Sequence, residues 1–174
     1  VSVGNLAYHY SNKESIVFAL YNDLTQQQKQ LLAEYKVVPL FDNIDLLIRH
    51  TYQLQQQYIF FYLDTLEIVR AYPKIGEAHR QHISMQIAQL KSIIYFNVSR
   101  GALIDEPMEG LFEKLATQIW MTTDFWLAKH KIRIDETTDE SAYREAIWSL
   151  FIPYFSVMGK LEYRQMLQMN FLNE

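Results

Sequence analysis

Helical periodicity dominates this sequence from end to end. In one segment after another, apolar residues recur every three or four positions, as they do along the buried stripe of an amphipathic helix. Runs in which apolar and polar residues alternate, as in half-buried strands, do not occur. With 49% hydrophobic residues and only 5 Gly and 4 Pro among 174 residues, the chain has much to bury and few turns. The sequence therefore predicts an all-α fold, an irregular helical bundle.

Capping and breaking residues divide this pattern into helices. Ser11 and Glu14 are spaced as a capping box that starts the first long helix, and residues 137–140 repeat the spacing near the other end. Pro153 is expected to kink the fifth helix, and Gly159 to end it. Helices are predicted over residues 11–35, 42–73, 75–100, 105–131, 138–158 and 161–172.

The two segments 108–131 and 138–158 are apolar on more than one helical face. A helix that is apolar all round has to be buried all round, either within its own domain or against a second copy of the chain. The small number of helices available to cover them favours a homodimer through these two segments, although both could be central helices of a monomer. The predicted dimer interface consists of Trp126, Tyr143, Ile147, Leu150, Phe151 and Tyr154.

Charge and composition exclude several classes of protein. The net charge of -4 has the wrong sign for a complete nucleic-acid-binding surface. Cysteine is absent, so disulfides, thiolate nucleophiles and cysteine metal sites are impossible, and a cytoplasmic location is the expectation. No apolar run is long enough for a membrane span, and residues 1–5 do not resemble a signal peptide. Because the sequence starts without Met, we expect it to be part of a longer chain.

The first sixteen residues read VSVGNLAYHYSNKESI. Their order resembles the end of the helix-turn-helix of TetR-family transcriptional regulators, in which a glycine opens the recognition helix, a His-aromatic pair closes it and a Lys-Glu pair begins the next helix. The matching residues are Gly4, His9, Tyr10, Lys13, Glu14 and Ile16. The resemblance implies a TetR-like all-α dimer. Residues 1–21 would be the incomplete DNA-binding domain, and residues 22–174 an irregular helical ligand-binding and dimerisation bundle.

The resemblance also implies contacts with operator DNA. A short helix over residues 4–9 can enter a major groove, where Asn5 offers both a donor and an acceptor to a base edge. Lys13 lies in the first turn of the next helix, where amides and lysine can bind one phosphate. The expected DNA-binding residues are Gly4, Asn5, Tyr8, His9 and Lys13. Many members of the family have a tyrosine in place of Ala7 and a basic or small residue in place of Val3. Two further helices are expected before Val1, so operator DNA is a partner of the full-length protein only.

A TetR-like mechanism implies that a small molecule binds among the middle helices and moves the helix that joins the two domains. Polar groups set within apolar stripes are the candidate ligand contacts. They are Tyr58, Tyr62, His82, Gln86 and Trp120. The aromatic-rich sequence suggests an apolar or aromatic effector, and no cofactor is expected. The same residues could instead be ordinary core and surface positions, because tyrosines on amphipathic helices usually extend their hydroxyls to water.

Two other classes of function remain open. An enzyme would need a nucleophile, a metal site or paired carboxylates, and the sequence contains no Gly-x-Ser-x-Gly elbow, no His-Glu-x-x-His motif and no phosphate loop. His79 and His82 could hold a metal ion together with Asp64 or Glu67 from the preceding helix, or could be ordinary hydrogen-bonded histidines. The second class is a helical adaptor that binds a protein partner through its aromatic helices and does not contact DNA.

Overall fold

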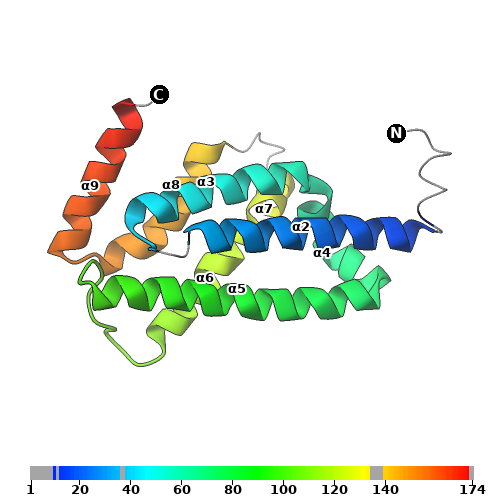
Figure 1. The fold of residues 1–174 in the computed structure, drawn as a ribbon, viewed down its shortest axis with the longest axis horizontal. Helices are drawn as coiled ribbons and strands as arrows, with labels where there is room; N and C mark the ends of the chain where they lie inside the picture. Colours follow the sequence, from blue (N-terminus) through cyan, green and yellow to red (C-terminus); the bar gives the residue numbers. More distant parts are fainter. Residues whose placement is uncertain (1–9, 11, 36–37, 134–138, 173–174) are drawn as a thin grey trace.

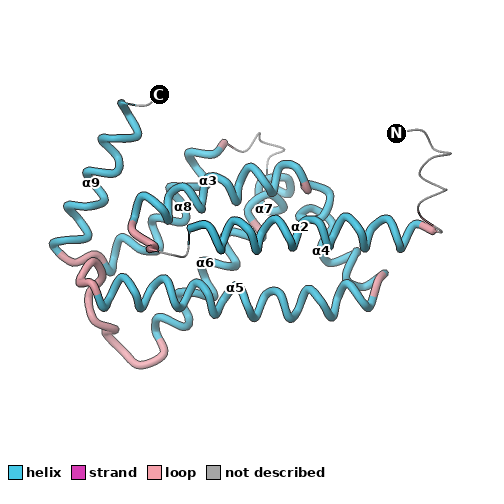
Figure 2. The backbone as a smooth tube through the Cα atoms, viewed as in Figure 1, coloured by secondary structure: helices cyan, strands magenta, loops and turns pink. Residues whose placement is uncertain are grey.

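The protein is helical throughout the part that the computed structural model describes, which comprises residues 10, 12–35, 38–133 and 139–172. This part contains eight α-helices and one 3-10 turn, and no strand. The all-α prediction is confirmed. The helices, drawn in Figures 1 and 2, are α2 (Lys13–Tyr35), α3 (Phe41–Gln57), α4 (Ile59–Ala71), α5 (Pro73–Ser99), α6 (Leu111–Asp124), α7 (Trp126–Arg133), α8 (Glu140–Phe151), the turn η1 (Ile152–Tyr154) and α9 (Val157–Leu172).

Polar side chains begin α2 and α8 close to the predicted positions. At the start of α2, the Asn12 side-chain oxygen accepts a hydrogen bond of 2.9 Å from the amide of Ser15, and the Ser15 hydroxyl donates to the Asn12 carbonyl. Asp139 caps α8 by accepting a 2.6 Å hydrogen bond from the amide of Ala142. Ser11 and Thr137, the predicted caps, lie outside the described residues. The side chains of Asn12 and Asp139 thus bind backbone amides that the first turn of a helix leaves without a partner.

The single helix predicted over residues 42–73 is two helices, which is a correction. The chain leaves helical geometry at Tyr58, where φ is −111° and ψ is 32°. Tyr58 donates a hydrogen bond to Asp23 and accepts one of 2.8 Å from Gln27, both on α2. No Pro or Gly marks this break. The break coincides with this contact between Tyr58 and α2, and the helical periodicity of a sequence cannot predict a contact of this kind. The helix predicted over 105–131 is likewise divided, at Phe125.

The C-terminal segment also differs from the prediction. Pro153 does more than kink a helix: α8 ends at Phe151, and a 3-10 turn and an extended Phe155 follow. Gly159 lies inside α9 and does not end a helix. A Cβ atom at Gly159 would lie 2.1 Å from the carbonyl oxygen of Ala102. Glycine is therefore needed here because the α9 backbone passes directly against the turn that follows α5.

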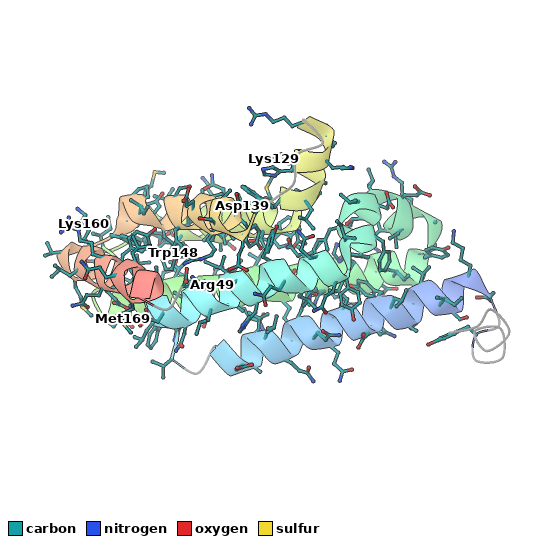
Figure 3. All side chains as sticks on the ribbon, turned by 90° about the horizontal axis from the view of Figure 1, so that it is seen from above. Arg49, Lys129, Asp139, Trp148, Lys160 and Met169 are labelled. Carbon is teal, nitrogen blue, oxygen red and sulfur yellow. The ribbon has the colours of Figure 1, made fainter. Side chains whose placement is uncertain are left out.

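The long helices α2, α3 and α5 run along the molecule, and α9 stands at the end opposite the start of α2 (Figure 1). The view from above in Figure 3 places Met169 and Lys160 of α9 at that same end. Glu162 attaches α9 to the bundle, because it accepts hydrogen bonds of 2.7 and 2.8 Å from Arg100 and one of 3.0 Å from the amide of Phe41. A bidentate arginine-carboxylate pair of this kind fixes orientation as well as distance.

Aromatic side chains fill the core around α8. The Tyr143 ring packs against Tyr52 of α3 and Trp126 of α7, with centroids 5.2 and 5.7 Å away. On the next turns, Trp148 donates a 2.9 Å hydrogen bond to Asp45, which is buried on α3. Helix α8 also packs on α6. The protomer therefore covers most of the apolar surface of α8 by itself.

Candidate ligand-binding cavity

A cavity of about 90 Å³ opens among α2, α3, α5, α6 and α8. Most of its wall is apolar, with contributions from every one of these helices. Representative apolar lining residues are Leu31, Ile44, Leu90, Ile119, Ile147 and Phe151. The polar lining residues are Gln28, Thr51, Gln86, Trp120, Thr123 and Asp124. An apolar cleft with a few converging polar groups is typical of small-molecule sites in proteins.

Asp124 lines this cavity at the last residue of α6. Its carboxylate accepts a 3.0 Å hydrogen bond from the indole N–H of Trp120, one turn earlier. Burial raises the pKa of the Asp124 carboxyl to about 7, although the hydrogen bond from Trp120 acts in the opposite direction. Both protonation states of Asp124 are therefore accessible near neutral pH, and small changes in the cavity can shift the balance between them.

Gln86 and Trp120 are the two predicted ligand contacts that line the cavity. Trp120 is oriented by its hydrogen bond to Asp124. The side-chain oxygen of Gln86 is buried and has no hydrogen-bond partner within the described residues. A buried acceptor without a partner is uncommon, and it marks a place where a ligand or water can bind.

Tyr58, Tyr62 and His82 were also predicted as ligand contacts, but they do not line the cavity. The tyrosine hydroxyls bind α2 instead, Tyr58 through Asp23 and Gln27, and Tyr62 by accepting 2.8 Å from Gln28. His82 is buried on α5. Desolvation there lowers the pKa of His82 to about 4, so the ring is neutral at physiological pH.

Asp124 and Gln28 are cavity residues that periodicity did not identify. A signal for Asp124 was available, because it is a carboxylate within the segment 108–131 that is apolar on several faces. Such a residue has to be buried with its helix, and buried carboxylates need a partner. Gln28 belongs to the polar stretch QQQKQ, which looks like a solvated helix face, and nothing in it distinguishes the one glutamine that turns inward.

His79 and His82 do not form part of a metal site in the described part of the chain, where no group of three His, Cys, Asp or Glu residues is placed to hold an ion. His79 packs edge-on against Tyr21 and Phe61, and its ring nitrogen lies 3.5 Å from the Tyr21 hydroxyl. Burial lowers the pKa of His79 to about 4. In the same described residues, no helix is both long enough and apolar enough to cross a membrane.

Residues 21–163 match the TetR family, described as "Bacterial transcriptional repressor". This range includes every residue of the cavity wall. The chain belongs to the TetR family. Its fold is similar to that of a solved TetR-family transcriptional regulator from Marinobacter aquaeolei VT8, with a TM-score of 0.77 and 18% identity over 97% of this chain and 82% of that chain. No curated protein matches the chain. The predicted family and the TetR-like fold are therefore confirmed.

Among the residues that this TetR-family chain was predicted to present to DNA, Lys13 alone lies in the described part. It is exposed in the first turn of α2, as predicted for a phosphate contact. Gly4, Asn5, Tyr8 and His9 lie outside the described residues. Helix α2 continues from Lys13 without a break to Gln28 and Leu31 in the cavity wall, so one rigid element of the TetR-family protein connects the predicted DNA contact to the cavity.

The side chains predicted for a dimer interface in this TetR-family chain lie mostly inside the protomer. Trp126, Tyr143, Ile147 and Phe151 are buried, with exposed fractions of 5% or less. The reason is that α3, α6 and α7 cover α8 on the sides where these residues lie. Leu150 and Tyr154, the other two predicted contacts, are half-buried. A partner surface on these helices therefore has to use other side chains.

Proposed function

We propose that this chain is the ligand-binding and dimerisation part, residues 22–174, of a TetR-family repressor that releases operator DNA when a small molecule enters the cavity. The observation that carries this proposal is the continuity of α2, which joins Lys13 at one end to the cavity wall at Gln28. Fifteen residues of helix span about 22 Å at the usual rise of 1.5 Å per residue. A displacement at the cavity is therefore transmitted over that distance by a single helix.

Three hydrogen bonds to two tyrosines of the neighbouring segment hold α2 in its present position. Tyr62 accepts from Gln28, which itself lines the cavity, and Tyr58 accepts from Gln27 and donates to Asp23. A ligand in this cavity lies against Gln28 and Leu31 on the α2 side of the wall. The α2 side of that wall is held by these polar contacts as well as by packing. In the proposed mechanism, the ligand favours an arrangement in which α2 has shifted and the recognition helices no longer match the major grooves.

Repression and ligand binding are coupled reciprocally in this mechanism. If the ligand weakens DNA binding by some factor, DNA weakens ligand binding by the same factor. A tightly binding molecule with equal affinity for both positions of α2 would change nothing. The effector therefore has to bind more tightly when α2 has shifted than when α2 is in its present position, where Gln28 forms part of the cavity wall.

Dimerisation is expected for a TetR-family protein, and we place part of the surface in segment 138–158 and its continuation in α9. Ile152 and Met158 are 44% and 46% exposed, and Leu161 and Met169 are exposed further along α9. Met158, Leu161 and Met169 are spaced by three and eight residues, which puts them on one face of the helix. An exposed apolar stripe of this kind favours association with a like surface. The segment 108–131 offers Met121 and Phe125, each 50% exposed.

The proposed DNA function is tested with the full-length protein, the form for which operator DNA is the expected partner. Sequences selected from a random duplex pool by that protein should share a two-fold symmetric site, since a dimer reads two half-sites. Binding to the selected site should weaken steeply with salt. Selection of no common sequence would contradict the regulator and would favour the adaptor function.

A further inference from the structure

Asp124 differs in its partners from Asp45, the buried aspartate of α3. Asp45 also accepts a hydrogen bond from a tryptophan N–H, at 2.9 Å from Trp148. However, Asp45 is in addition paired with Arg144 through bonds of 3.0 and 2.8 Å, and Arg49 lies 3.3 Å away. Asp124 has the tryptophan bond alone: within the described residues, its carboxylate has no arginine, lysine or histidine partner. Asp124 lines the cavity, so a ligand bound there can contact its carboxylate.

The cavity wall contains a second hydrogen-bond acceptor that lacks a donor. Asp124 is the one ionisable residue among those that line it. The side-chain oxygen of Gln86, also in the wall, is a buried acceptor without a donor among the described residues. Two acceptors without enough donors, inside an apolar wall, are complementary to a ligand that brings several N–H groups and a hydrocarbon body. A carboxylate ligand would meet repulsion from Asp124 and no cationic side chain.

We propose that the effector is an amphipathic organic cation, an alkyl or arylalkyl ammonium, whose charged nitrogen binds Asp124 and Gln86 while its hydrocarbon part lies against Ile119 and Phe151. This inference rests on the proposed ligand response, since it names the chemical class of the ligand for the same cavity. The raised pKa of Asp124 supports it, because a carboxyl without a counter-ion is held partly protonated by burial, and an incoming ammonium restores the charged form. A desolvated carboxylate that lacks a cationic partner within the described residues is what a cation-selective site requires.

The test uses three small probes of nearly equal shape that differ in charge: n-butylamine, 1-butanol and butyrate. Each is small enough for a cavity of about 90 Å³. Binding to the wild-type chain is followed by ligand-observed NMR titration, one pH unit above the pKa of Asp124, so that the carboxylate is charged. We expect n-butylamine to bind at least about tenfold more tightly than 1-butanol, the factor expected for one charge-assisted hydrogen bond. We expect butyrate to bind most weakly.

Two variants assign the preference to Asp124. In Asp124→Asn, which keeps the shape and removes the charge, the preference for n-butylamine over 1-butanol should disappear. Glu113→Gln is the matched control, because Glu113 lies on the same helix, is exposed and pairs with Lys91 outside the cavity. It should keep the full preference. If Asp124→Asn does not fold, as judged by circular dichroism, the charge series on the wild-type chain still decides the question.

The outcomes separate this inference from the function on which it rests. Equal or tighter binding of 1-butanol or butyrate would overturn the cationic ligand and leave a ligand-responsive cavity in place. A preference for n-butylamine that persists in Asp124→Asn would also overturn the inference, because the charge would then be recognised elsewhere. Failure of all three probes to bind would contradict the cavity as a ligand site and the proposed function with it.

Discussion

Gln28 of α2 donates a 2.8 Å hydrogen bond to the hydroxyl of Tyr62 on α4, and the same glutamine lines the cavity. Tyr62 is 4% exposed, and burial raises the pKa of its hydroxyl far above the usual value, so this group stays protonated. A ligand that displaces Gln28 has to break or move this bond. The pair therefore links occupation of the cavity to the position of α2.

Removing the Tyr62 hydroxyl should weaken the attachment of α2 to α4 without leaving a cavity in the core. In Tyr62→Phe, Gln28 loses its partner but the ring is retained, so we expect a loss of about 1 kcal/mol in the free energy of unfolding. Urea denaturation measures it. Tyr95→Phe is the control, because Tyr95 is 43% exposed and donates to Glu106 at the surface. Its effect should be below about 0.5 kcal/mol. Equal losses of unfolding free energy in the two variants would contradict a stabilising role of the buried Gln28–Tyr62 hydrogen bond.

The sequence predicted the helices that local signals define, and it missed the breaks at Tyr58 and Phe125. Helix α2 and helix α5 have their predicted extents within a few residues, because capping residues and Pro73 mark their ends. The breaks at Tyr58 and Phe125 have no such mark. At Tyr58 the accompanying contact is with Asp23, 35 residues away in the chain.

Part of the candidate site could also be predicted. Gln86 and Trp120 were identified because polar groups in an apolar stripe have to find a partner or a cavity. Tyr58 and Tyr62 satisfied the same criterion but found partners on α2. Periodicity can identify which residues face inward, but it cannot say which neighbour each one meets. The same limit explains why apolar residues of α8 such as Tyr143 were predicted for a dimer interface and lie in the protomer core.

Breaking the buried ion pair of the core should be costly. In Arg144→Met, Asp45 loses the hydrogen bonds of 3.0 and 2.8 Å from Arg144 while remaining buried, so we expect a loss of about 3 kcal/mol in the free energy of unfolding. Lys91→Met removes a 3.0 Å pair with Glu113 at the surface and should cost at most about 1 kcal/mol. Thermal denaturation of both variants under identical conditions compares them. A similar change in both would mean that Arg49 alone is a sufficient partner for Asp45.

The buried histidines predict loss of stability in acid. Burial lowers the pKa of His79 and of His82 to about 4, below the ordinary value of 6.5. Between these values the two histidines bind protons in the unfolded chain and not in the folded chain, so their contribution to stability decreases as the pH falls from about 6.5 to 4. Denaturation curves collected across this range measure the slope. The double variant His79→Gln and His82→Gln should have a shallower slope, and an unchanged slope would assign the acid sensitivity to other groups.

Asp124 predicts a pH effect of opposite sign. Because its folded pKa is raised from 3.8 to about 7, the unfolded chain loses this proton first, and stability decreases as the pH rises between these values. Asp124→Asn should therefore be more stable than the wild type above pH 7 and nearly equal to it in acid. Urea denaturation of both proteins at several pH values measures the difference. A variant that is less stable than the wild type at every pH would contradict a desolvated carboxylate without a cationic partner.

Close contact at Gly159 predicts a strong effect of a single methyl group. A Cβ atom there would meet the Ala102 carbonyl oxygen at 2.1 Å, so Gly159→Ala has to push α9 away from the turn that it contacts. We expect a loss of about 1–3 kcal/mol despite the better helix propensity of alanine. Gln165→Ala, at an exposed position of α9, is the control and should be neutral within about 0.5 kcal/mol. A neutral Gly159→Ala would show that α9 can shift freely.

The exposed stripe of α9 predicts which substitution separates a dimer. Leu161→Glu places a charge in the middle of the apolar face formed with Met158 and Met169, so we expect it to shift the chain towards the monomer. Met85→Glu adds the same charge at a 38% exposed position of α5 and should leave the assembly intact. Sedimentation velocity on both variants distinguishes them. Dissociation by Met85→Glu and not by Leu161→Glu would move the interface to α5.

In the proposed mechanism this TetR-family chain acts as a homodimer. Two copies are required to read two half-sites and to release the operator DNA when a ligand binds. Light scattering over a dilution series of the chain tests it most directly. We predict a mass near twice 20.7 kDa that persists on dilution. A mass that stays at 20.7 kDa at every concentration would contradict the two-copy regulator, whatever binds in the cavity.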